Sequence, residues 1–381
     1  MKLTYIITGM FNSAGMERVV ANKANYFATH GHDVSIITTD QNGRPYFYNI
    51  NPLVKHIDLA INYFEYNTKS IIFKPFLFFY KTHLFKQRLT AELFKERPDV
   101  VISLSLKSVD FLYKIHDGST KIVEHHFSKF YAQQFSDTFN RKKFSRFIYN
   151  LRGKIESYYL KKYDHFVVLT QEDANLWGTK FKNLTVIPNS LSFIPTTTSS
   201  CKKEIVVAIG RLDYQKGFDQ LIQIWNTAYL PGWELHIYGN GQERAFLQKL
   251  IEQSPTHKSI KLFAATNQVE TVLNNSSIYA LTSRFEGFPM ILLEAMSYGL
   301  PVVAMDCKCG PREIITHYSD GFLIDEQALE AFAEKLRLLM QNESLRQRMG
   351  AKASHNILRF SEDTIMDEWN TLFTHSTKSN H

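Results

Sequence analysis

Short apolar strands alternate with helical segments twice along this 381-residue chain, and this alternation is the feature that most constrains its fold. The first series begins with an apolar, β-rich stretch at 3–8, a loop that contains glycine, and a helical pattern at 16–29. His-Gly-His at 30–32 ends that helix, and 34–38 reads as the next strand. A strand, a crossover helix and a further strand form a parallel sheet. The sequence therefore predicts a doubly wound α/β fold.

A polar stretch without periodicity, residues 195–203, separates the two series and is typical of a linker. At roughly 150 residues per domain, the length also favours two domains. We expect a first Rossmann-like domain over 1–194, a second over 204–360, and a crossover helix with a tail over 361–381. Two such domains would face each other across a ligand cleft at the carboxyl ends of their strands.

The charge is unevenly distributed between the two halves. Residues 1–195 contain 26 Lys and Arg against 16 Asp and Glu, whereas the rest contains 18 against 21. Residues 121–163 alone hold ten basic and three acidic side chains. Such a face favours an anionic partner, such as a lipid surface or a phosphorylated acceptor, although a solvated helix surface explains it equally well.

Cysteine content and the first residues indicate the compartment. Three cysteines are too few for a disulfide framework, and Cys307-x-Cys309 lacks the second pair that a structural zinc site needs. The first residues do not read as a signal peptide, and no run approaches the ~20 apolar residues that span a membrane. We expect a cytoplasmic protein.

Two carboxylates frame the sequence 286–295, Glu-Gly-Phe-Pro-Met-Ile-Leu-Leu-Glu-Ala. Glu286 follows the predicted strand 278–281, Pro289 suits the first turn of a helix, and Glu294 lies one to two turns into it. Carboxylates placed in this way can accept hydrogen bonds from vicinal sugar hydroxyls. The alternative, in which Glu286 caps the helix, does not account for Glu294 in an otherwise apolar stretch.

The sequence 210–217, Gly-Arg-Leu-Asp-Tyr-Gln-Lys-Gly, connects the predicted strand 205–209 to a helix. Arg211 and Lys216 at a helix N-terminus predict a diphosphate site, because cations there can hold a departing nucleoside diphosphate without a metal. The spacing is not that of a Walker loop, which disfavours ATP hydrolysis. A surface turn with two solvated cations is the alternative.

Three weaker signals follow other predicted strands. The loop 9–18 is not Gly-x-Gly-x-x-Gly, which disfavours a nicotinamide site, but Gly15 would let the backbone approach a phosphate or a sugar. His125 and His126 end the strand at 121–124, where a histidine is equally able to bind a hydroxyl or to be structural. Gly239 and Asn240 form a tight turn of second rank. No Asp-x-Asp occurs, which argues against a diphosphate held by a divalent cation.

Together these motifs closely resemble the retaining glycosyltransferase family 4, whose members have the GT-B fold. The resemblance covers nearly the whole chain and is strongest over 205–325, where Gly-Leu-Pro-Val-Val at 299–303 follows the two motifs above. Residues 306–321 are similar to members that build bacterial surface polysaccharides. Near the N-terminus, 14–18 resembles the family's Gly-Gly-x-Glu-Arg element, with Ala14 in place of its first glycine.

The resemblance implies a role for each candidate residue. Arg211 and Lys216 would hold the donor diphosphate above Gly15, Glu294 would bind the ribose, and Glu286 would bind the transferred sugar. The committed site is: catalytic Glu286 and His125; donor-binding Gly15, Arg211, Lys216, Phe288, Pro289, Met290 and Glu294; second rank Gly239, Asn240 and His126; no metal.

The resemblance also implies the reaction. The first domain would bind a glycan or lipid-linked acceptor, and the second a UDP- or GDP-sugar. The sugar would be transferred with retention of configuration, the leaving phosphate would take the acceptor's proton, and no metal or cofactor would be needed. A last helix, over 360–373, would cross back onto the first domain. The implied setting is bacterial cell-surface polysaccharide, including lipopolysaccharide, biosynthesis.

Residues 71–86 interleave aromatic side chains with lysines, a pattern typical of a helix that lies on a membrane surface. A core-facing helix is the favoured alternative. With the basic segment 121–163, the pattern suggests peripheral association of the first domain with the inner face of the cytoplasmic membrane.

Two other classes of protein are compatible with the sequence. A sugar-nucleotide epimerase of the same architecture would convert the donor without an acceptor, and a non-catalytic partner subunit would keep the fold without the chemistry. Nucleic-acid binding is disfavoured, because the basic stretch contains no recognisable reading motif and the second half is acidic.

Overall fold

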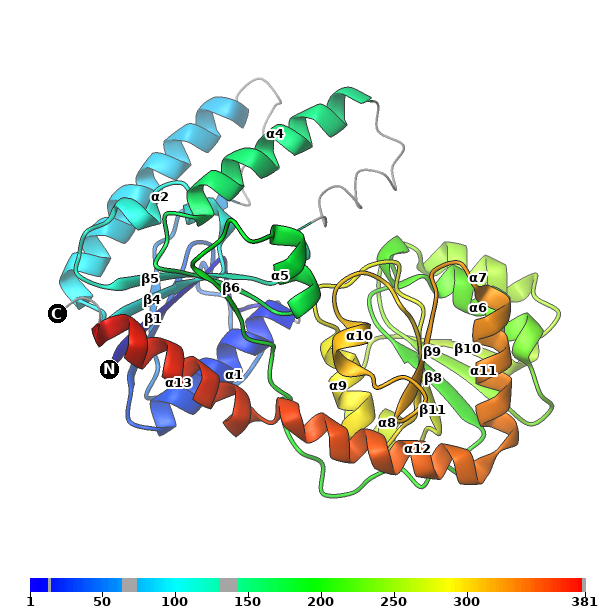
Figure 1. Ribbon diagram of the computed structural model, residues 1–381. Helices are drawn as coiled ribbons and strands as arrows, with labels where there is room; N and C mark the ends of the chain where they lie inside the picture. The colour runs from blue at the N-terminus through cyan, green and yellow to red at the C-terminus, as the bar shows by residue number, and fades with distance from the viewer. Residues whose placement is uncertain (13–14, 64–73, 130–142, 379–381) are drawn as a thin grey trace. The chain divides into compact units, whose positions relative to one another are not determined.

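The computed structural model describes residues 1–12, 15–63, 74–129 and 143–378, with the side chains of 74–75, 143–150 and 376–378 left out. The chain divides into two compact units (Figure 1). The N-terminal unit contains 1–169, 174–187 and 365–381, and the C-terminal unit contains 170–173 and 188–364. Residues 195–203, expected as a linker, contain no helix or strand.

The N-terminal unit is built on a seven-stranded parallel sheet with the order β3-β2-β1-β4-β5-β6-β7. Its strands are β1 Lys2–Ile7, β2 Asp33–Thr38, β3 Lys55–Asp58, β4 Val100–Ser103, β5 Thr120–His125, β6 His165–Val168 and β7 Leu184–Val186. Its helices are α1 Gly15–Thr29, α2 Lys74–Glu96, α4 Lys143–Leu160, most of α5 Gln171–Trp177 and most of α13 Glu362–Lys378. The strand order reverses between β1 and β4, and in such sheets ligands bind outside the carboxyl ends of the strands at that point.

Helices cover both faces of this sheet, with α1 and α13 on one and α2 and α4 on the other (Figure 1). The last helix, α13, belongs to this unit from Ile365 onwards, as the sequence predicted. It is anchored by Trp369 and Phe373, both almost completely buried, and the Phe373 ring lies 5.5 Å from that of Phe27 in α1.

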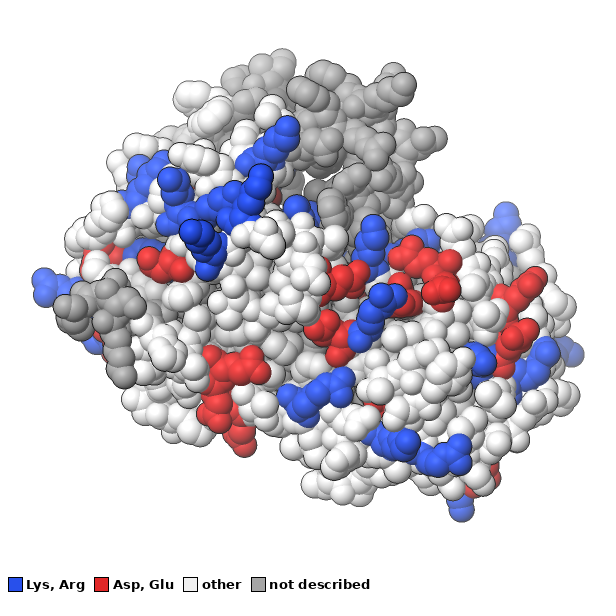
Figure 2. Space-filling model, viewed as in Figure 1, with Lys and Arg blue, Asp and Glu red and all other residues white. Residues whose placement is uncertain are grey.

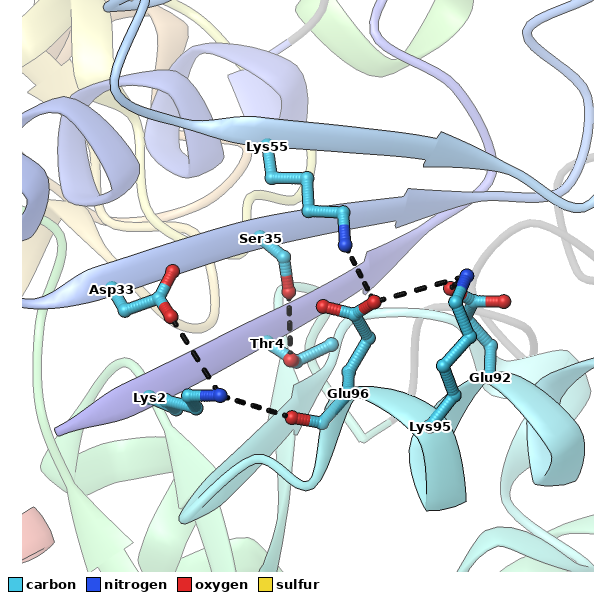
Figure 3. Close-up of polar contacts among 8 residues, drawn as sticks. All are labelled: Lys2, Thr4, Asp33, Ser35, Lys55, Glu92, Lys95 and Glu96. Carbon is cyan, nitrogen blue, oxygen red and sulfur yellow. Dashed lines mark hydrogen bonds and ion pairs between the residues drawn. The ribbon is translucent and has the colours of Figure 1, made fainter.

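Polar contacts gather at the amino ends of the first strands (Figure 3). Lys55 at the start of β3 forms an ion pair with Glu96 at the end of α2, with 2.5 Å between Nζ and Oε1. Lys2 Nζ donates to the carbonyl oxygen of Glu96 at 3.4 Å and lies 4.0 Å from Asp33 Oδ2. These contacts fix the exit of α2 at the sheet edge opposite to the carboxyl ends, where ligands bind.

The C-terminal unit is a six-stranded parallel sheet with the order β10-β9-β8-β11-β12-β13. Its strands are β8 Ile205–Ile209, β9 Glu234–Tyr238, β10 Ile260–Phe263, β11 Ile278–Leu281, β12 Val302–Met305 and β13 Gly321–Ile324. Its helices are α6 Phe218–Ala228, α7 Arg244–Glu252, α8 Val269–Asn274, α9 Met290–Ser297, α10 Pro311–Ile314, α11 Leu329–Gln341 and α12 Glu343–Asn356. The strand order reverses between β8 and β11, so the loops after these two strands flank the expected ligand crevice.

The core of this unit forms because its strands are apolar on both faces, as buried parallel strands are. Helices α6 and α11 pack together against one face, and α9 and α12 against the other (Figure 1). Trp225 of α6 is completely buried, and its indole N–H donates to Ser259 Oγ at 2.9 Å. Both predicted α/β series are therefore confirmed.

Candidate donor site

The loop after β8 contains the two predicted cations, but they lie in different surroundings. Lys216 closes a 3₁₀ turn, Tyr214–Lys216, and its side chain is 14% exposed. Arg211 is 69% exposed at its side chain, and its Nη2 lies 3.1 Å from Asp213 Oδ2. Gly217 then adopts a positive φ of 64° and leads into α6. Lys216 is held in place within the unit, whereas Arg211 projects into solvent and can reorient toward an anion.

Lys216 and Glu286 form the central contact of the site. Lys216 Nζ donates to Glu286 Oε1 at 2.7 Å, and Glu286 is 7% exposed. The two residues come from the loops after β8 and β11, which flank the point where the strand order reverses. The pair brings a cation suited to a phosphate next to a carboxylate suited to a hydroxyl. Two predictions made from separate motifs therefore meet at one place.

The helix after Glu286 starts one residue later than the sequence suggested. Pro289 is the N-cap of α9, which begins at Met290, and no side chain caps this end. Glu286 therefore does not cap the helix, and its binding to Lys216 replaces that alternative. Since Pro289 has no N–H, only Phe288 and Met290 of the predicted backbone donors can donate to a ligand.

Glu294 lies in the second turn of α9 and is 2% exposed. It shares its surroundings with Glu286. The pKa of Tyr279 is raised first by burial and then by the charges of both carboxylates. The Tyr279 hydroxyl donates to the Ile209 carbonyl oxygen at 3.2 Å, which ties β11 to the end of β8. Both predicted carboxylates thus lie near one tyrosine behind the same two loops.

The second-rank turn at Gly239 and Asn240 lies directly against the cationic loop. Leu212 N donates to the Asn240 carbonyl oxygen at 2.9 Å. A Cβ at Gly239 would come within 2.0 Å of the Gly210 carbonyl oxygen, and one at Gly241 within 2.2 Å of the Leu212 carbonyl oxygen. Only glycine allows this approach, so the turn supports the shape of the loop that carries Arg211.

In the N-terminal unit, His125 is the last residue of β5 and lies among aromatic rings. Its ring centroid is 5.7 Å from that of Trp177 and 6.2 Å from that of Phe166. Burial lowers the pKa of His125 to about 4, and its Nε2 lies 3.8 Å from Glu156 Oε1. A neutral imidazole can exchange hydrogen bonds with a hydroxyl but supplies no positive charge.

His126 belongs to a buried charge cluster instead. Its Nε2 lies 3.0 Å from Glu124 Oε1, which also accepts a 2.5 Å hydrogen bond from Lys23 Nζ. Lys23 Nζ lies 3.8 Å from the centre of a Trp369 ring in α13. Burial alone would raise the pKa of Glu124, but Lys23 and His126 outweigh it and lower the pKa to about 2. His126 therefore contacts a structural ion pair, which favours His125 as the candidate for substrate contact.

Gly15 is the first residue of α1, directly after the undescribed residues 13 and 14. It is exposed, and a Cβ there would meet nothing within 4 Å. Packing therefore does not require glycine at this position. The open backbone at a helix N-terminus is compatible with the predicted approach of a phosphate, which stays a prediction.

Sequence reasoning missed two residues that shape the site, Arg284 and Asp219. Arg284 Nη2 lies 2.6 Å from Asp219 Oδ2, across 65 positions of sequence. Neither residue belongs to a motif with a known spacing. The opposite charges beside the two main motifs were the only available signal.

Metal and membrane features were searched within the described ranges. There, no group of three or more His, Cys, Asp or Glu is arranged to hold a metal ion. All three cysteines are free and buried. Among the helices that the structure describes, none is both long and apolar enough to cross a membrane.

The fold and this site define a glycosyltransferase of the GT-B class, and comparison with known proteins specifies the family. Residues 13–192 match the model of Glycosyltransferase Family 4, and residues 194–356 match that of Glycosyl transferases group 1. The amylovoran biosynthesis glycosyltransferase AmsD of Erwinia amylovora is 30% identical over 97% of this chain and 99% of its own length. The chain belongs to glycosyltransferase family 4.

Solved structures support the fold. The crystal structure of S. aureus TarM in complex with fondaparinux, α-GlcNAc-glycerol and UDP has a TM-score of 0.77 at 18% identity, covering 98% of this chain and 99% of that one. Sucrose-phosphate synthase from Thermosynechococcus elongatus reaches 0.82 at 16% identity, covering 99% of both chains. At these identities the likeness concerns the fold, and it confirms the predicted GT-B architecture.

Proposed function

We propose that this glycosyltransferase transfers a hexose from a UDP-sugar to a glycan or lipid-linked acceptor during the synthesis of a cell-surface polysaccharide, with retention of configuration and without a metal. The observation that carries the donor assignment is the Lys216–Glu286 pair where the strand order of the C-terminal sheet reverses. The polysaccharide setting is supported by the name of the AmsD relative, and UDP by the TarM complex.

The site suggests how its residues divide the work. Lys216 keeps N–H donors beyond the one bound to Glu286, and with Arg211 it can neutralise the diphosphate as it leaves. Glu286 holds Lys216 with one oxygen and can accept a sugar hydroxyl with the other. This engagement favours a binding role for Glu286 over a nucleophilic one. The acceptor hydroxyl would then attack from the face that the diphosphate leaves, and the leaving phosphate would take its proton.

An assay with the full-length protein tests this proposal. UDP-glucose, UDP-galactose, UDP-GlcNAc and GDP-mannose are incubated with isolated acceptor glycolipids in EDTA or Mg²⁺, and the released nucleotide and the anomeric linkage are measured. We expect one donor to be used equally well in both buffers, with its α or β configuration kept. Lys216→Ala should lower the rate at least 100-fold, and Lys249→Ala, an exposed site on α7, should not.

Three results would contradict the proposal. Inversion would exclude the retaining mechanism, and loss of activity in EDTA would exclude metal independence. Conversion of a nucleotide sugar to its epimer without acceptor would favour the epimerase alternative.

We also propose that the N-terminal unit associates with an anionic membrane. In α2, Phe85, Leu89 and Leu93 are completely buried, so this part faces the core, whereas Phe76 and Phe79 are 77% and 72% exposed. Residues 71–73 of the predicted segment lie outside the described residues, as do 130–142 of the basic one. Figure 2 shows Lys and Arg side chains grouped over α4. Exposed aromatic residues and basic charge together suit an anionic lipid surface.

Vesicle sedimentation at low salt tests the membrane proposal. The protein should pellet with phosphatidylglycerol vesicles more than with phosphatidylcholine vesicles, and Phe76→Ser/Phe79→Ser should pellet less. Failure of the wild type to pellet with anionic vesicles would rule the association out.

A further inference from the structure

Arg284 connects the two loops of the donor site through its guanidinium group. It lies in the loop after β11, two residues before Glu286. Its Nη1 and Nη2 donate to Asp219 Oδ1 and Oδ2 at 2.9 and 2.6 Å, a bidentate pair with the first turn of α6. Nη1 also donates to the Tyr214 carbonyl oxygen at 2.7 Å. One side chain therefore holds both the turn that ends at Lys216 and the helix that follows it.

The same residue contacts this turn in two further ways. Arg284 N donates to the Gln215 carbonyl oxygen at 2.8 Å. The guanidinium carbon lies 3.9 Å from the centre of the Tyr214 ring, which covers one face of the group. The side chains of Arg284 and Asp219 are only 18% and 22% exposed, so their ion pair is less screened by water than a surface pair.

Two independent contacts keep the loops together next to this clamp. Gln215 Nε2 donates to the Phe285 carbonyl oxygen at 2.9 Å, and Thr282 Oγ1 donates to the Lys216 carbonyl oxygen at 3.2 Å. Loss of the Arg284 side chain would therefore leave the loops near each other but the turn less firmly held.

We propose that Arg284 is a positioning residue of the donor site, which places Lys216 by fixing the turn Tyr214–Lys216 and does not itself bind the nucleotide. This inference rests on the proposed function. Both terminal nitrogens of Arg284 already donate to Asp219, one donates also to a carbonyl oxygen, and an aromatic ring lies over the planar group. A ligand would have to displace these contacts to reach it.

Calorimetric titration of the full chain with UDP and with GDP, in EDTA, tests the inference. Arg284→Ala should weaken nucleotide binding at least tenfold. Arg284→Lys should weaken it nearly as much, because lysine keeps the charge but cannot form the bidentate pair or the stack. Arg348→Ala, an exposed arginine on α12, serves as the matched control and should bind like the wild type.

A double-mutant cycle separates positioning from direct contact. If Arg284 acts through Lys216, then Arg284→Ala should weaken binding by less than twofold in a Lys216→Ala background. The same tenfold loss in both backgrounds would show that Arg284 binds the nucleotide directly, and would overturn the inference. Unchanged binding in Arg284→Ala would overturn it as well.

Two controls keep the outcome clear. If Arg284→Ala unfolds because Asp219 loses its partner, Arg284→Ala/Asp219→Ala removes both charges and replaces it in the cycle. Wild-type binding is measured first, since a wild type that binds neither nucleotide would overturn the proposed function together with this inference. A wild type that binds, with an additive cycle, would overturn only the role of Arg284.

Discussion

At the scale of single residues, the burial of His125 makes the stability of the fold depend on pH. Its pKa is lowered by burial to about 4, whereas an unfolded histidine titrates near 6.5. Between these values the unfolded chain binds the proton and the folded chain does not, so stability falls as the pH falls. Going from pH 7 to pH 5, this group alone should remove roughly 2 kcal/mol from the free energy of unfolding.

Urea unfolding at pH 7 and pH 5 checks this prediction. His125→Gln should lose less stability between the two pH values than the wild type, by roughly 2 kcal/mol. His355→Gln, at an exposed site on α12, should keep the full dependence. Equal losses in His125→Gln and in the wild type would show that His125 is not buried in its neutral form.

The pair of Lys23 and Glu124 should be costly to break from one side. Lys23→Met leaves Glu124 buried without its cation, and we expect the free energy of unfolding to fall by about 3–5 kcal/mol. Lys23→Met/Glu124→Leu removes both charges and should recover most of that loss. Urea unfolding measures both variants. A loss below about 1 kcal/mol in Lys23→Met would mean that Glu124 has another partner or takes up a proton.

At the scale of elements, the turn after β9 supports the donor loop, and Gly241 tests this. Gly241→Ala places a Cβ within 2.2 Å of the Leu212 carbonyl oxygen, so the loop must shift. We expect a loss of roughly 1–3 kcal/mol in stability together with weaker UDP binding. Gly153→Ala in α4, where a Cβ meets nothing within 4 Å, should instead stabilise by roughly 0.5–1 kcal/mol. A Gly241→Ala variant that binds UDP like the wild type would separate this turn from the site.

The elements also show what the sequence can predict. The strands and helices around the site were predictable within one to three residues because apolar strands, Gly299 and Pro301 mark their ends locally. The ion pairs Lys216–Glu286 and Arg284–Asp219 join residues 70 and 65 positions apart. Composition places both partners near loops, but only the strand order brings the loops after β8 and β11 side by side. The aromatic pocket of His125 was hidden for the same reason, since Trp177 lies far along the chain.

At the scale of the whole molecule, two parallel sheets of similar design divide the candidate residues. The cations and both glutamates belong to the C-terminal unit, and His125, His126 and Gly15 to the N-terminal unit. This division was predictable from the repeated α/β series. It also predicts that nucleotide binding depends mainly on C-terminal residues, and that substitution of His125 affects transfer more than UDP affinity.

The central claim is a metal-independent nucleotide-diphosphate site built on Lys216 and Glu286, and thermal unfolding with UDP, GDP and ADP in EDTA tests it most directly. A ligand at ~100 times its dissociation constant stabilises the folded state by about 2.7 kcal/mol. We predict a rise in melting temperature with one nucleotide that is unchanged by EDTA and lost in Arg211→Ala/Lys216→Ala. No rise with any nucleotide, or an equal rise in the double variant, would contradict the account.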